Sequence, residues 1–177
     1  MKKTFLLFTL LLCGLCVLTT LNSGCRAYNF SGRGTIPDTI HTVRVNFIEN
    51  RAPYVNPQLS PNLTDRLKQK IGNQTRLTQV NNDNVDWDIR GYVSDYSPST
   101  VGITSTNGHS QTSVNRLTVT VHISIVKPNT SQPQEFDVSH SFDFSANQSL
   151  QQAEAQLLDE IVRNLTDEIF NRLFSDW

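Results

Sequence analysis

The chain has 177 residues, of which 37% are hydrophobic and 18% charged, and its formal net charge at pH 7 is −1. A chain of this length can bury one core of ordinary size, so we expect one folded domain rather than several. The charges form no block of one sign, which argues against a nucleic-acid partner because such a partner requires a basic stripe.

The amino terminus has the layout of a secretory signal peptide. Lys2 and Lys3 precede an uncharged, largely apolar run over 5–21, and small residues follow before Cys25. Export signals share this order of positive start, apolar middle and small-residue neck. The alternative is an uncleaved transmembrane anchor, because a run of about 18 apolar residues has the borderline length for spanning a bilayer. We predict that residues 1–24 are a cleaved signal peptide.

The end of this segment, Ser23-Gly24-Cys25, resembles the lipobox of bacterial lipoproteins, where the cysteine is acylated and becomes the first mature residue. We therefore expect lipid on Cys25 and attachment to the outer membrane of a Gram-negative bacterium. Arg26 agrees, because an aspartate there resembles an inner-membrane retention signal in enterobacterial lipoproteins. Asn22 departs from the lipobox, which usually has leucine at that position.

The mature chain would retain Cys25 as its single cysteine, because Cys13 and Cys16 lie in the removed part. No intrachain disulfide is then possible. The removed part contains two lysines and no acids, so 13 basic and 16 acidic side chains remain, a formal charge of −3. Residues 25–40 read as a lipidated linker rich in turn formers, and 41–177 as a single domain. Triacylation would anchor the protein without any membrane-inserting segment in that domain.

The first elements of the domain are a predicted strand and a predicted short helix. From Thr42 the chain alternates between polar and apolar residues, which indicates a strand buried on one face. The apolar period then changes to four residues, with Ser60 as the expected N-cap, Pro61 at the first helical position and Gly72 at the end. The apolar residues are Val43, Val45 and Phe47 in the strand and Leu59, Leu63, Leu67 and Ile71 in the helix.

Further strands follow. A brief one is expected at 75–80, and alternation returns over 85–93. Residues 97–113 have almost no core-forming side chains and are predicted to form a long polar hairpin excursion. The strongest alternation in the chain covers 117–125 and predicts a strand buried on one face.

A last strand and a long helix complete the domain. Over 136–144 the apolar residues occupy one face, which His140 shares. Ser149 and Gln152 form a predicted capping box that opens a helix running nearly to Trp177. The apolar residues are Phe136, Val138, Phe142 and Phe144 in the strand and Leu157, Leu158, Ile161, Val162, Leu165, Ile169 and Leu173 in the helix.

Alternation in every strand predicts a sheet with one apolar and one polar face. Two amphipathic helices can cover the apolar face, so the expected fold is α+β: a two-layer sandwich with a mostly antiparallel sheet of four to five strands. The opposite face is left for water or a partner. Its expected members are Arg44, Asn46, Asp88, Arg90, Tyr92, Thr118, Thr120 and His122.

In order and spacing, these features resemble the LptE family of lipopolysaccharide-assembly lipoproteins. The resemblance covers nearly all of the mature chain, although each motif is short. The matching features are Gly24-Cys25 followed by 28–32, the strand 41–47 ending at Glu49-Asn50, Leu59 and Ser60 with Leu63-Thr64 in the next helix, 89–91, 115–119 and the final helix.

The resemblance implies a protein that binds lipopolysaccharide and stabilises or plugs a partner barrel, the outer-membrane translocon protein LptD. Since lipopolysaccharide carries phosphates and acidic sugars, the candidate ligands are Arg90, Arg116 and Lys127. The ordinary alternative is a solvated surface charge, or for Arg116 a strand-end ion pair. The excursion with its Asn107-Gly108 turn resembles the family's membrane-distal hairpin tip, which would enter the barrel lumen. Its alternative is an ordinary mobile loop.

No enzyme signature is apparent. The four histidines lack metal-ligand spacing, and neither a Gly-x-Ser-x-Gly elbow nor a phosphate loop occurs, so we expect no catalysis, metal or cofactor. Asp86 and Asp88 beside Arg90 are interpreted as a solvated strand edge, and His140 as a core histidine. Two other functions remain open: an unrelated outer-membrane lipoprotein adaptor, such as a secretin pilot or envelope scaffold, and a periplasmic carrier of an apolar ligand.

Overall fold

The computed structural model describes residues 36–174 except 107–108, 129 and 131, and over 102–113 it describes the backbone alone. The predicted signal peptide and Cys25 therefore lie outside the described residues. None of the helices in the described part is long and apolar enough to cross a membrane. The elements are β1 (Thr42–Val45), β2 (Glu49–Asn50), α2 (Leu59–Gln74), β3 (Thr78–Gln79), β4 (Trp87–Thr106), β5 (His109–Val126), β6 (Gln134–Ser145) and α3 (Leu150–Phe174).

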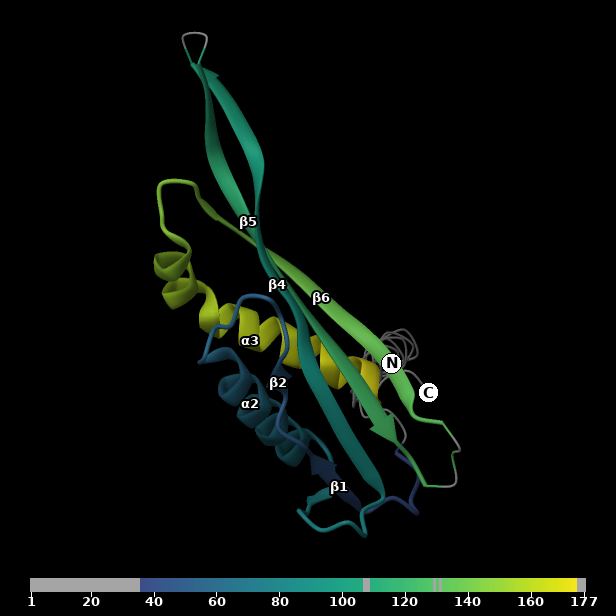
Figure 1. Ribbon diagram of the computed structural model, residues 1–177. Coiled ribbons are helices and arrows are strands. Elements are labelled where there is room, and N and C mark those ends of the chain that lie inside the picture. Colours follow the sequence, from purple (N-terminus) through teal and green to yellow (C-terminus); the bar gives the residue numbers. More distant parts are fainter. Residues whose placement is uncertain (1–35, 107–108, 129, 131, 175–177) are drawn as a thin grey trace, which may run out of the picture. The chain divides into compact units, whose positions relative to one another are not determined.

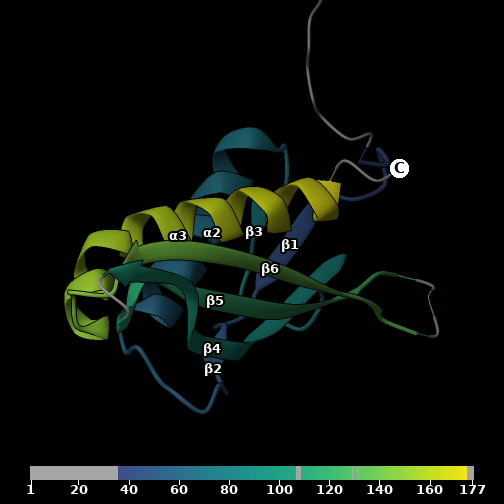
Figure 2. The same cartoon turned by 90° about the horizontal axis from the view of Figure 1, so that it is seen from above.

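The strands form one sheet in the order β3-β1-β4-β5-β6, and β2 continues beside β4. The long pairings, β4 with β5 and β5 with β6, are antiparallel. The short pairings of β1 with β3 and β4, and of β2 with β4, are parallel, because α2 lies between them in the chain as a crossover connection. Helices α2 and α3 cover one face of the sheet (Figures 1 and 2). The predicted two-layer α+β fold is confirmed, with a sheet that is partly parallel.

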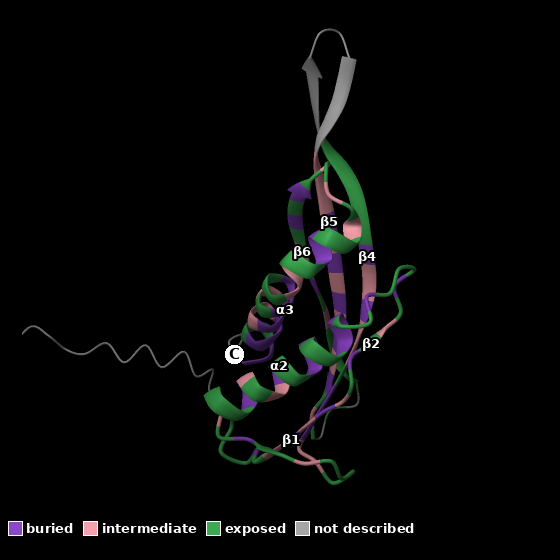
Figure 3. Ribbon diagram, turned by 90° about the vertical axis from the view of Figure 1, so that its left-hand side faces the viewer, coloured by how far each residue is buried: buried purple, intermediate pink, exposed green. Residues whose placement is uncertain are grey.

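The core lies between the helices and the sheet, where buried residues recur at alternate strand positions (Figure 3). All five apolar residues predicted between 117 and 125 are at most 1% exposed. The four predicted apolar residues of α2 have no exposed surface. The short strand expected at 75–80 is present as β3. The helical and strand periods therefore identified the inward residues of these elements.

Alternation predicts that Phe47 lies on the apolar face, and that prediction is wrong. β1 ends at Val45. Two residues, Asn46 and Phe47, then lie outside the core before the next buried residue, whereas strict alternation allows only one. Ile48 takes the inward place with 1% exposure, and its N–H donates to Thr64 Oγ1 in α2 (3.0 Å). Phe47 is left 56% exposed. An extra residue that shifts the inward set by one is the local effect of a β-bulge.

The predicted ends of α2 are also wrong. Gln58, not Ser60, is the N-cap residue, and the side chain that assists there is Asn56, whose Oδ1 accepts from Gln58 N–H (3.0 Å). Ser60 instead lies buried within the first turn. Gly72 does not end the helix, which continues to Gln74.

The capping box of α3 is confirmed. Ser149 Oγ accepts from Gln152 N–H (3.2 Å), and Gln152 Oε1 accepts from Ser149 N–H (3.0 Å). We expect Ser149→Ala to lower the free energy of unfolding by about 1 kcal/mol, because the substitution leaves a helix-terminal N–H without its acceptor. Gln151→Ala, at an exposed position of the same turn, is the control and should change it by less than about 0.5 kcal/mol. Equal effects in urea unfolding would contradict the capping role.

Candidate functional site: the open face of the sheet and its hairpin

The polar segment 97–113 belongs to a long hairpin. β4 and β5 pair from Asp88↔Val126 to Thr106↔His109, so the predicted polar hairpin excursion is formed by the continuous ends of these two strands. The predicted Asn107-Gly108 turn lies between the paired ends but outside the described residues. β6 accompanies β5 only as far as Val114, so the end of the hairpin projects beyond β6 (Figure 1).

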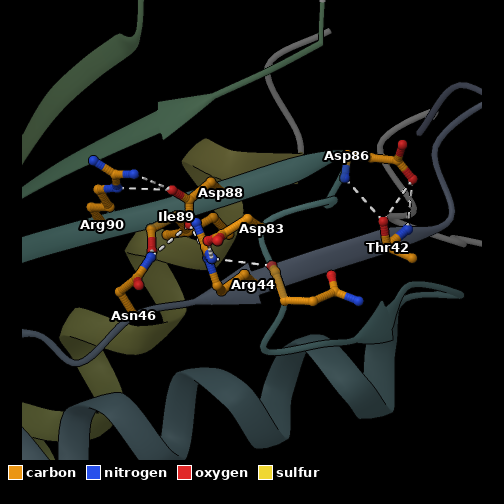
Figure 4. Close-up of polar contacts among 9 residues, drawn as sticks. Thr42, Arg44, Asn46, Asp83, Asp86, Asp88, Ile89 and Arg90 are labelled. Carbon is orange, nitrogen blue, oxygen red and sulfur yellow. Dashed lines mark hydrogen bonds and ion pairs between the residues drawn. The ribbon is translucent and has the colours of Figure 1, made fainter.

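The open face is the sheet surface opposite the two helices. Near its β1 end, Asp88 accepts three side-chain donors (Figure 4). Arg44 Nε (2.8 Å) and Asn46 Nδ2 (2.6 Å) donate to Oδ1, and Arg90 Nε (2.8 Å) donates to Oδ2. Arg44 also pairs with Asp83 at 2.7 Å. Asp88 joins the β1 and β4 strands through these contacts.

The three donors hold the Asp88 carboxylate in its charged form although the residue is only 6% exposed. Its pKa is lowered to about 2, first by the hydrogen bond from Arg44, and the opposing effect of burial is smaller. The interpretation of Asp88 as part of a solvated edge is therefore wrong. The signal that could have identified its burial was the presence of Arg44 and Asn46 on the neighbouring strand.

Asp86 has a different structural role. Its Oδ2 accepts the backbone N–H groups of His41 and Thr42 and the Thr42 hydroxyl, each at 2.9 Å. These hydrogen bonds, with that from His41 as the largest cause, lower the pKa of Asp86. The carboxylate thus attaches the start of β1 to the start of β4. The contacts of both aspartates are those of structural acceptors rather than of an acid–base pair.

Farther along the open face lies an aromatic and cationic group. The Tyr92 ring contacts His122, with centroids 5.0 Å apart, and the Arg51 guanidinium lies 4.5 Å above the same ring. His122 Nδ1 is 2.8 Å from Asp137 Oδ1. Because Phe47, Glu49 and Arg51 are two residues apart and Glu49 pairs with Tyr92, Phe47 shares this face.

Sequence reasoning missed Phe47 and Arg51 as members of this face. The available signal was the adjacent pair Phe47-Ile48, because two consecutive strand residues cannot both point to the core. Toward the hairpin this face carries two hydroxyl pairs between β5 and β6, followed by the Arg116–Asp143 ion pair. The hydroxyl pairs are Thr118 with Ser141 (3.0 Å) and Thr120 with Ser139 (2.9 Å).

The three predicted lipopolysaccharide ligands do not form one cluster. Arg90 is 62% exposed and pairs with Asp88 at 2.7 Å. Arg116 makes two hydrogen bonds to Asp143 (2.6 and 2.9 Å), which is the strand-end ion pair given as its alternative. Arg116 is eight residues along β5 from Ser124, the register partner of Arg90. At the usual rise per residue this separation is about 27 Å.

Lys127 directly follows β5, near the start of β4. Its Nζ donates to Gln134 Oε1 (2.8 Å) and lies 5.3 Å from the Trp87 ring centroid. Burial lowers the pKa of Lys127. Lys127 also lines an open recess of about 380 Å³ together with Asp86 and Trp87. Among the described residues there is no group of three or more His, Cys, Asp or Glu side chains that could hold a metal ion.

Comparison with known proteins gives a family and a shared fold. The family model LptE, described as lipopolysaccharide-assembly, matches residues 40–173. The rare lipoprotein B structure from Shewanella oneidensis is 15% identical with a TM-score of 0.51, covering 75% of this chain and 93% of that one. A hypothetical protein from Chlamydia trachomatis is 7% identical with a TM-score of 0.51, covering 76% of this chain and 95% of that one.

At these identities the two structures show similarity of fold alone. A search among curated proteins finds no match. The family model, in contrast, spans the described domain from the residue before His41 to Leu173 in the last turn of α3, and so includes the open face and the hairpin. The chain therefore belongs to the LptE family of lipopolysaccharide-assembly lipoproteins.

Proposed function

We propose that this protein is a lipid-anchored component of the lipopolysaccharide translocon, attached by Cys25 to the periplasmic side of the outer membrane. It binds lipopolysaccharide, and it stabilises or plugs a barrel partner of the LptD type. The observation that carries the proposal is the family match over 40–173. Its role is binding rather than catalysis.

The hairpin supports the plugging role. Residues 109–113 of β5 lie beyond the pairing with β6, and at the usual rise they extend about 17 Å. A two-stranded hairpin is narrow, and its strands pair with each other as far as Thr106↔His109. Alternate residues of such a pair direct their N–H and C=O groups outward, so the projecting end can hydrogen bond to water or to the wall of a lumen. We propose that this end of the hairpin enters the partner barrel.

The open face supports lipopolysaccharide binding through Arg90, the most exposed of the candidate arginines. We expect Arg90→Gln to weaken binding of purified lipopolysaccharide about tenfold, the usual effect of losing one charge-assisted contact. Arg66→Gln removes the same charge from an exposed position of α2 and serves as the control. Titration by fluorescence or calorimetry gives the two dissociation constants. Equal constants for the two variants would remove Arg90 from the binding site.

Depletion of the protein in the living cell tests the partnership. We expect the amount of correctly assembled barrel partner in the outer membrane to fall, because the barrel would lose the protein that stabilises it. An unrelated barrel of similar size is the control. Unchanged assembly of the partner would favour the adaptor function instead, in which a pilot or scaffold lipoprotein serves a different complex.

A further inference from the structure

Strand β6 forms one edge of the sheet. Within the part of the chain that the structure describes, it pairs with β5 alone. Asp137 O accepts a hydrogen bond from Arg172 of α3 (3.0 Å), so the backbone of residue 137 points away from β5. The β5–β6 register is continuous, and alternate residues of a strand direct their backbone groups to the same side. Ser139, Ser141 and Asp143 therefore also present N–H and C=O groups at the edge.

A recess accompanies this edge. Helix α3 runs along β6 (Figure 2), and an open recess of about 320 Å³ lies where the two elements meet. Its surface combines apolar side chains with polar groups of the strand. The lining residues are Arg116, Ser141, Phe142, Asp143, Leu157 and Glu160. Because Leu157 is only partly buried against the core, an apolar side chain from outside can pack against it.

The edge is acidic. Glu135, Asp137 and Asp143 lie on β6, and Glu160 and Glu168 lie on the adjacent part of α3. The guanidinium groups that contact this set are those of Arg116, which pairs with Asp143, and Arg172, which lies 3.4 Å from Glu168. The imidazoles of His122 and His140 also contact Asp137 (2.8 Å) and Glu168 (2.7 Å). The five carboxylates still outnumber these four basic side chains along the edge.

This charge pattern selects among possible strand partners. Antiparallel pairing of β6 with a second copy of β6 would place carboxylates close to carboxylates, which is unfavourable. A basic segment would instead gain favourable cross-strand charge pairs in addition to main-chain hydrogen bonds. The edge is thus protected against self-association and complementary to a cationic strand.

We propose that the β6 edge binds a basic, extended segment of another polypeptide, which adds to the sheet as a further strand and places one apolar side chain in the recess beside Leu157. The main-chain groups of Ser139, Ser141 and Asp143 supply the pairing, and Glu160 and Asp143 supply the charge selection. This site lies on the opposite edge of the sheet from β3 and does not depend on lipopolysaccharide binding.

The probe is a nine-residue peptide of alternating lysine and threonine with one central leucine, added to the full mature protein. The matched control peptide has glutamate in place of every lysine. We expect fluorescence anisotropy to give the basic peptide a dissociation constant at least tenfold lower than that of the control peptide. In its complex, the amides of Ser139, Ser141 and Asp143 should exchange with deuterium at least tenfold more slowly. Binding without slower exchange at these amides would overturn the proposal, because simple charge attraction forms no strand.

A pair of α3 variants gives the second test. Glu160→Lys reverses a charge that lines the recess, and Asp159→Lys reverses the neighbouring exposed charge outside it. We expect Glu160→Lys to weaken binding of the basic peptide about tenfold. Asp159→Lys should change the dissociation constant less than twofold. Equal weakening by both variants would show that net charge, rather than the recess, attracts the peptide.

Discussion

Replacement of Gly91 with alanine is expected to lower the free energy of unfolding by about 1–3 kcal/mol, the usual range for overpacking a core. A Cβ atom at this position in β4 would lie 2.7 Å from Ile123 Cδ1 and 2.8 Å from the backbone oxygen of His122. The isoleucine methyl group can rotate away. The backbone oxygen cannot move without disturbing the β4–β5 pairing, because Gly91 and Ile123 are direct register partners.

Gly72→Ala in α2 is the matched control. A Cβ there would lie 3.2 Å from Gln79 Nε2, the end of a flexible side chain. Alanine is favoured over glycine inside a helix by about 1 kcal/mol, which offsets the displacement of Gln79. In urea unfolding, the free energy of unfolding of Gly72→Ala should therefore lie within about 1 kcal/mol of the parent value, while that of Gly91→Ala should be clearly lower. A Gly91→Ala variant as stable as the parent would contradict the close approach of β4 to β5.

Asp88→Ala should also lower the free energy of unfolding, by about 3 kcal/mol, because it removes the nearly buried acceptor that three side-chain donors share and leaves Arg44 with Asp83 alone. Arg44 would lose the acceptor of its Nε hydrogen bond, and Asn46 would lose that of its amide group. This value is a large fraction of the stability of an ordinary domain. Asp83→Ala removes the exposed partner of Arg44 instead and should cost less than about 1 kcal/mol. A smaller loss for Asp88→Ala than for Asp83→Ala would contradict the account.

The same carboxylate predicts a pH dependence. Its pKa is about 2 in the folded protein against 3.8 for an unperturbed aspartate, so the unfolded state binds the proton more readily. The stabilisation is complete above pH 3.8 and is lost as the pH falls toward 2, a contribution of about 2 kcal/mol. The parent should lose more stability than Asp88→Asn over this interval. Parallel curves for the two proteins would exclude Asp88 as the group responsible.

The spacing of apolar residues predicted most of the fold, because residues that share the buried face recur at regular intervals along a strand or a helix. Leu63 and Leu67 in α2, and Val119 and Val121 in β5, are all fully buried as alternation and helical spacing required. Phe47 was misplaced because one inserted residue exchanges the faces of a strand without changing its composition.

Errors at the ends of elements have another physical origin. Ser60 has the right chemistry for an N-cap, but α2 starts two residues earlier at the N-cap Gln58, whose N–H donates to the Asn56 side chain, and it continues past Gly72. The low hydrophobicity of 97–113 correctly predicted a polar hairpin outside the core, but it did not show that the hairpin continues the two core strands without a break. β4 and β5 pair there through backbone groups, which every sequence carries.

The candidate site was predicted in its location but not in its pairings. The eight polar residues assigned to the open face include Arg44, Asp88 and Arg90, which meet there. That Arg116 engages Asp143 depends on the β5–β6 register, which two separated strand patterns do not determine. Sequence alone therefore indicated which side chains share the face, and the register showed which of them contact one another.

We propose that this protein works as the partner of an outer-membrane barrel in lipopolysaccharide assembly. The most direct measurement is affinity purification of the tagged full-length protein from detergent-solubilised outer membranes, followed by identification of the proteins retained at equal stoichiometry. We predict a stable pair with one LptD-type barrel protein, and loss of that pair when residues 99–114 are replaced by a short turn. Purification without any barrel protein, or with another envelope complex in its place, would contradict the claim.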